Sequence, residues 1–237
     1  MELDICSLGN AIVDIQFSIT NEYEEELNNL QMTKGSMMLV EQDQQEGMIK
    51  KLNSIYGIPL MACGGSAINS MVAASCFGSN CHVSGKVSND EHGNYFLEDL
   101  GNNNIQHSIT PFQSEVTTAR CLVMVSPDAE RTMCTHLGIS NDLSEKNIDL
   151  EAIHSAKYLF IEGYLLSSSS ALEACKIAIK TAKNHGTKVA ISLSAEFIAA
   201  NFKKELDSLF EMGCDLLVCN ESEALALAND SEFGLAA

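Results

Sequence analysis

The sequence has 237 residues, of which 46% are hydrophobic and 19% charged, the composition of a globular protein with a substantial core. Its 14 lysine and arginine residues stand against 32 aspartate and glutamate residues, which gives a formal net charge of −18. A field of this sign repels phosphate backbones and anionic lipid, so the charge argues against binding to nucleic acid or to a membrane surface.

Hydrophobic periodicity predicts an alternation of strands and helices along most of the chain. Strands are expected at residues 3–9, 81–87, 105–110, 157–162, 188–192 and 215–219. Helices are expected at residues 42–56, 66–77, 91–102, 168–185, 195–202, 204–212 and from 221 onward, with a solvated helical face at 21–29. This alternation is typical of a doubly wound α/β fold, in which a mostly parallel sheet carries helices on both faces.

Three further β-rich stretches do not fit the alternation; they lie near residues 11–19, 36–40 and 118–136. The Pro127-Asp128 pair inside the third stretch has turn chemistry and predicts a hairpin. We expect these stretches to form a small β-sheet lid that projects from the main sheet. The whole of residues 1–237 then forms one α/β domain.

Compartment and membrane topology are also indicated. The nine cysteines are scattered without a Cys-x-x-Cys pair, as expected of reduced thiols in a cytoplasmic protein. The N-terminus carries acids where a signal peptide would carry basic residues. Residues 52–85 hold no charge, but glycines and Pro59 interrupt them, so we expect them to be buried or to line a ligand pocket rather than to span a membrane.

Ligands of open α/β sheets bind beyond the carboxyl ends of the strands, and polar residues follow the first predicted strand. Asp14 is an acid among apolar neighbours, a costly arrangement unless it is paired or hydrogen-bonded, although a solvated loop acid explains it equally well. Gly64 and Gly65 precede a helix and would let a ligand approach its free N–H groups. Asn69 follows in the first turn; a tight turn with ordinary capping is the alternative.

Two other groups of residues suit phosphate chemistry. Asn220 and Glu223 lie after the last predicted strand, where the acid either complements the helix dipole or holds Mg²⁺ with phosphate through water. The two arginines of the chain, Arg120 and Arg131, both lie in the predicted lid. Arginine suits bidentate recognition of anions, so a lid that carries both over a phosphate site is one interpretation, and two surface arginines on strands is the other.

Six stretches occur in a fixed order along the chain: GNAIVD (9–14), CGGSAINS (63–70), GKVSNDEHG (85–93), TARCLVMV with ERTM (118–125, 130–133), IEGYLL (161–166) and CNESEALAL (219–227). Together they resemble the PfkB or ribokinase-like family of carbohydrate and nucleoside kinases, in particular its adenosine-kinase-like branch. The resemblance implies ATP-dependent phosphorylation of a sugar or nucleoside hydroxyl, with ATP and Mg²⁺ as cofactors. It also suggests a homodimer through the β lid.

The resemblance assigns roles to individual residues. Substrate binding is expected of Asp14, Gly64, Gly65, Asn69 and Arg120. ATP binding is expected of Asn220, Glu223 and Arg131, and Glu223 is in addition the expected contact to the metal.

One departure from the family concerns its second signature, a Gly-Ala-Gly-Asp run that supplies the general base and an oxyanion hole. After Gly213 the chain contains only Gly234, and apart from Asp215 its only later aspartate is Asp230. We therefore expect the C-terminal catalytic part to be missing, the general base to lie beyond Ala237, and this chain alone to be inactive as a kinase. The alternatives are a sugar- or nucleoside-binding protein or remnant without catalysis, and an unrelated doubly wound enzyme.

Overall fold

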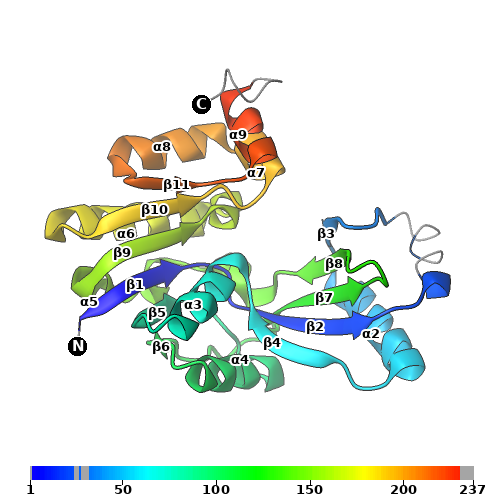
Figure 1. Ribbon diagram of the computed structural model, residues 1–237. Coiled ribbons are helices and arrows are strands. Elements are labelled where there is room, and N and C mark those ends of the chain that lie inside the picture. The colour runs from blue at the N-terminus through cyan, green and yellow to red at the C-terminus, as the bar shows by residue number, and fades with distance from the viewer. Residues whose placement is uncertain (1, 24–26, 28–31, 230–237) are drawn as a thin grey trace.

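The computed structural model describes residues 2–23, 27 and 32–229 (Figure 1). Most of the helical face predicted at residues 21–29 lies outside the described residues, as do Asp230 and Gly234. The main sheet has six strands in the order β11 (Leu216–Val218), β10 (Lys188–Ser192), β9 (Ala156–Glu162), β1 (Leu3–Leu8), β5 (Cys81–Ser84) and β6 (Gln106–His107). All five pairings are parallel.

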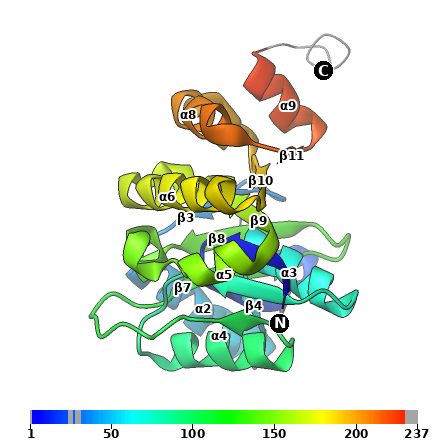
Figure 2. The same ribbon diagram turned by 90° about the vertical axis from the view of Figure 1, so that its left-hand side faces the viewer.

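Helices cover both faces of this sheet, which confirms the predicted doubly wound fold. One face packs against α5 (Leu150–Ser155), α6 (Ser169–His185) and α8 (Lys203–Gly213). The other packs against α3 (Ser66–Cys76) and α4 (Glu91–Asn102). Helix α6 lies close to the sheet because its buried stripe is mostly alanine, repeating with the helical period. Helices α7 (Glu196–Asn201) and α9 (Glu221–Ala228) pack on each other near β11 (Figure 1). Figure 2 shows α9 next to β11 and α8 at the same end of the molecule.

The second sheet, which we call the lid sheet, projects from one end of the main sheet (Figure 1). Its strand order is β3 (Met37–Leu39), β8 (Arg131–His136), β7 (Ala119–Val125), β2 (Ile12–Ser18) and β4 (Leu60–Gly64). The predicted hairpin is present as the antiparallel pair β7–β8, and helix α2 (Gln42–Tyr56) packs against the outer face of the lid sheet. Strand β4 was not predicted; it pairs antiparallel with β2.

Two chain crossings join the sheets at one place. Strand β1 continues through residues 9–11 into β2, and β4 continues through Gly65 into α3. The carboxyl ends of the central strands therefore face the inner side of the lid sheet. Two smaller differences from the sequence prediction are the short helix α5, which was not predicted, and β6, which covers only two of the residues expected at 105–110. Among the described helices, none combines the length and the apolar character needed to cross a membrane.

Candidate substrate site

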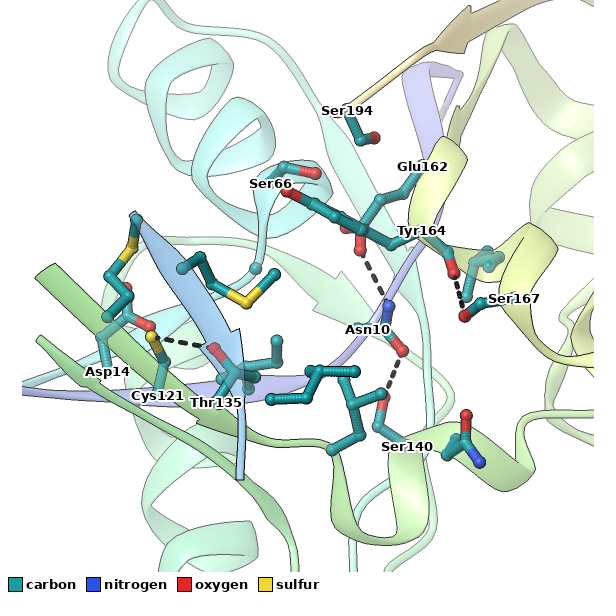
Figure 3. A pocket seen from close by; sticks show the side chains of 18 of the residues that line it. Asn10, Asp14, Ser66, Cys121, Thr135, Ser140, Glu162, Tyr164, Ser167 and Ser194 are labelled. Atoms are coloured by element: carbon teal, nitrogen blue, oxygen red, sulfur yellow. Dashed lines mark hydrogen bonds between the residues drawn. The ribbon is translucent and has the colours of Figure 1, made fainter. Parts of the chain in front are cut away.

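A cavity of about 340 Å³ lies between the carboxyl ends of the central strands and the inner face of the lid sheet (Figure 3). Its walls combine a polar end with an apolar end. Asn10, Asp14, Asn69 and Glu162 are polar members, and Met133 and Leu137 are examples of the apolar ones. Of the residues expected to bind substrate, Asp14, Gly65 and Asn69 line this cavity, whereas Gly64 does not.

Asp14 enters the cavity from β2. Burial raises the pKa of its carboxyl from 3.8 to about 6, and the nearby charge of Arg131 partly offsets that rise. No hydrogen-bond donor in the described part of the chain reaches this carboxylate. An acceptor that is largely buried and lacks a donor is costly in the free protein, which makes Asp14 ready to accept hydrogen bonds from a ligand.

Close contacts at positions 64 and 65 leave no room for a side chain, so both positions require glycine. A Cβ on Gly64 would collide with the Asp14 carboxylate, and a Cβ on Gly65 would collide with the carbonyl oxygen of Asn10. Gly65 also has a φ of +102°, a backbone conformation that residues other than glycine rarely adopt. Gly64 thus contacts Asp14, whereas Gly65 lines the cavity directly and brings Asn69 into it on the first turn of α3.

The floor of the cavity is a buried network that sequence reasoning missed. Glu162, at the end of β9, is 1% exposed and accepts hydrogen bonds from Asn10 Nδ2 (2.9 Å) and from the backbone N–H of Ala67 (3.0 Å). Asn10 Oδ1 in turn accepts from Ser140 Oγ at 2.9 Å (Figure 3). Burial raises the pKa of the Glu162 carboxyl, and these hydrogen bonds oppose the rise. In the sequence, Glu162 is a single acid at the end of an apolar strand. A single acid among apolar residues also singled out Asp14, so the same pattern could have identified Glu162.

The two arginines do not share a site. Every second residue of β8 faces the cavity, namely Arg131, Met133 and Thr135, and the residues between them face the other side of the sheet. Arg120 lies opposite His136 in the β7–β8 register and points to the outer face, where it is buried and forms an ion pair with Glu46 of α2 at 3.2 Å. This placement corrects the expectation that Arg120 reaches the substrate, because the strand alternation and α2 hold it on the opposite side of the sheet.

Asn220 and Glu223 form a reciprocal capping box at the start of α9. Asn220 Oδ1 accepts from the N–H of Glu223 at 2.9 Å, and Glu223 Oε2 accepts from the N–H of Asn220 at 3.2 Å. Neither residue is among those that line the 340 Å³ cavity. Among the described residues, no group of three or more His, Cys, Asp or Glu side chains is placed to hold a metal ion.

Comparison with known proteins places these observations in a family. The model of the pfkB family of carbohydrate kinases matches residues 59–234, about three-quarters of the chain. The chain belongs to the pfkB family. It is 25% identical to the guanosine-inosine kinase of Escherichia coli K12 over 234 residues, which cover 96% of this chain and 53% of that protein. The adenosine kinase of Schizosaccharomyces pombe is 27% identical over 181 residues, 73% of this chain and 52% of that one.

Solved structures agree with the family assignment. The adenosine kinase from Sinorhizobium meliloti superposes on this chain with a TM-score of 0.90 at 30% sequence identity. The match covers 100% of this pfkB chain and 70% of that structure. The chain spans about half the length of the curated relatives it matches.

Proposed function

We propose that this chain forms the substrate-binding part of a kinase that transfers phosphate from ATP to a hydroxyl of a nucleoside or sugar. The observation that carries the proposal is the unpartnered, largely buried carboxylate of Asp14 in the 340 Å³ cavity. Two adjacent hydroxyls of a ribose are donors at a spacing that one carboxylate accepts together, and hydrogen bonds to charged groups are stronger than neutral ones. Asn69 and the Gly64-Gly65 turn would border the same hydroxyls.

The floor network gives the proposed site its rigidity. Glu162 holds the Asn10 amide and the N-terminus of α3 in fixed positions, and Asn10 is in turn held by Ser140. Catalysis of phosphoryl transfer depends chiefly on positioning and on electrostatic stabilisation. In the proposed reaction the substrate hydroxyl gives up its proton to a general base, for which we propose no residue of this chain. Its oxygen bonds to the γ-phosphorus while the bond to the β–γ bridging oxygen breaks, and these residues would orient the substrate.

The cofactor assignments stay part of the proposal. Mg²⁺ bound with ATP neutralises charge on the transferring phosphoryl group, and Mg²⁺ is often held by one or two carboxylates together with phosphates and water. Glu223 provides one carboxylate, already engaged in capping α9, and Arg131 provides a cation at the cavity. We propose these two residues and Asn220 as contacts to the nucleotide. A homodimer through the lid sheet is likewise a proposal.

Calorimetry with adenosine, guanosine, ribose and fructose tests substrate binding directly. We expect saturable binding of at least one of them, and no binding of any would contradict the proposal. A second candidate is a binding protein without catalysis. ATP-dependent phosphate transfer by the product of the whole gene supports the kinase; binding without transfer by that product supports the second candidate.

A further inference from the structure

A row of side chains crosses the inner face of the lid sheet and leads from Asp14 to its far edge. The strand register sets Asp14 beside Cys121, Cys121 beside Thr135, and Thr135 beside Leu39. All four line the cavity. Neighbouring strands lie about 4.8 Å apart, so the row spans about 14 Å. This length suits a ribose with a bicyclic base attached, rather than a lone sugar.

The walls beyond Asp14 change from polar to apolar. Met133 and Leu137 belong to the lid side of the cavity, and Tyr164 and Phe197 to the main-sheet side, with their ring centroids 5.9 Å apart. Aliphatic side chains on one side and aromatic rings on the other suit the two faces of a planar base. A nucleoside whose ribose is held by Asp14 would therefore direct the outer edge of its base along the row toward Leu39.

The cavity adjoins a second hollow of about 270 Å³ at that end, since Leu39, Thr135, Leu137 and Asn141 line both. Glu41 lies in the wall of the second hollow, two residues after Leu39. Glu41 is the N-cap residue of α2, yet its side chain accepts no capping hydrogen bond. Within the described chain its carboxylate has no hydrogen bond or ion pair, so it is available to a ligand.

We propose that Glu41 reads the outer edge of the base and selects 6-oxopurine nucleosides, guanosine and inosine, over adenosine; this inference rests on the proposed function. A carboxylate only accepts hydrogen bonds. The guanine edge offers two adjacent donors, N1–H and the N2 amino group, which one carboxylate accepts together, and hypoxanthine offers N1–H alone. Adenine offers one donor at this edge, its N6 amino group, but beside it N1 carries a lone pair, so a carboxylate can accept one hydrogen bond there and its second oxygen is repelled.

Calorimetric titration of the wild-type chain with guanosine, inosine, adenosine and ribose tests the selection. We expect guanosine to bind at least about tenfold more tightly than adenosine, with inosine between them, because a group that pairs with a ligand's donors discriminates against the analogue that lacks them. Adenosine affinity equal to or above that of guanosine would overturn the inference. Binding of none of the four would instead overturn the proposed function and this inference with it.

The variant Glu41→Gln assigns the effect to the residue. We expect its guanosine affinity to fall about tenfold and the preference over adenosine to disappear, because the amide replaces one acceptor oxygen with a donor. Asp43→Asn is the matched control: Asp43 is an exposed acid in the first turn of the same helix and lines neither hollow. A preference unchanged in Glu41→Gln, or lost equally in Asp43→Asn, would contradict the role of Glu41.

Discussion

The cavity is lined by two carboxylates, Asp14 and Glu162, which differ in how their hydrogen-bonding capacity is satisfied. Glu162, on the floor, accepts hydrogen bonds on both oxygens from Asn10 and Ala67. Asp14, on the lid side, is largely buried with a pKa raised to about 6 and has no donor among the described residues. A carboxylate whose two oxygens both accept hydrogen bonds stabilises the fold. A carboxylate that no donor reaches lowers the stability of the free protein, and this cost is removed when a ligand donates hydrogen bonds to it. The contrast separates a supporting residue from a binding residue.

The largest expected effect comes from removing the supporting carboxylate. Glu162→Ala leaves the Asn10 amide and the Ala67 N–H buried without an acceptor, and each such group costs about 1–3 kcal/mol. We expect the free energy of unfolding in urea to fall by about 3 kcal/mol. Glu173→Ala, which removes an exposed acid paired with Lys176 on α6, is the control and is expected to change it by less than about 0.5 kcal/mol. A loss below about 1 kcal/mol in Glu162→Ala would contradict the supporting role.

The second comparison is between the two arginines. Arg120→Ala removes a buried ion pair and packing against α2, so we expect a loss of about 2 kcal/mol of stability with unchanged nucleoside affinity. Arg131→Ala is expected to leave stability unchanged and to weaken nucleoside binding at pH 6, because Asp14 loses the charge that favours its ionised form. Denaturant unfolding and calorimetry on both variants measure these effects. Weakened binding in Arg120→Ala, with unchanged binding in Arg131→Ala, would show that Arg120 rather than Arg131 acts at the site.

Removal of the binding carboxylate is expected to have the opposite profile to Glu162→Ala. Asp14→Asn keeps the shape of the side chain but puts a donor where a substrate hydroxyl also donates. We expect nucleoside affinity to fall at least about tenfold, or 1.4 kcal/mol, while the melting temperature stays the same or rises. A lowered melting temperature with unchanged affinity would show that Asp14 is structural.

The sequence predicted the parts of this account that depend on local patterns. Regular alternation of strands and helices located the strands of the main sheet, and β-rich stretches outside that alternation located the lid. The Gly64-Gly65 pair before a helix located the turn at the cavity. Strand β4 was missed because its five residues lie inside a long uncharged stretch and become a strand only through pairing with β2. Pairing between distant segments cannot be read from a local pattern.

The candidate site was predicted less completely, for reasons that Arg120 and Glu162 illustrate. The sequence allowed Arg120 and Arg131 to share one site, whereas the register of β7 and β8 puts them on opposite faces, and which face α2 covers depends on tertiary packing. Glu162 appeared only as part of a motif, because its partners Asn10 and Ala67 are far away in the sequence. Long-range hydrogen bonding, rather than residue type, decides which acid supports and which acid binds.

The central claim, that the ionised Asp14 carboxylate binds the substrate hydroxyls, is tested most directly by nucleoside affinity as a function of pH. Burial raises the pKa of Asp14 to about 6, so the fraction of free protein in the ionised form rises as the pH passes through 6. We expect affinity to increase about tenfold from pH 5 to pH 7 and then to level off, and to be independent of pH in Asp14→Asn. A wild-type profile that is flat over this range, or a rise that persists unchanged in Asp14→Asn, would contradict the claim.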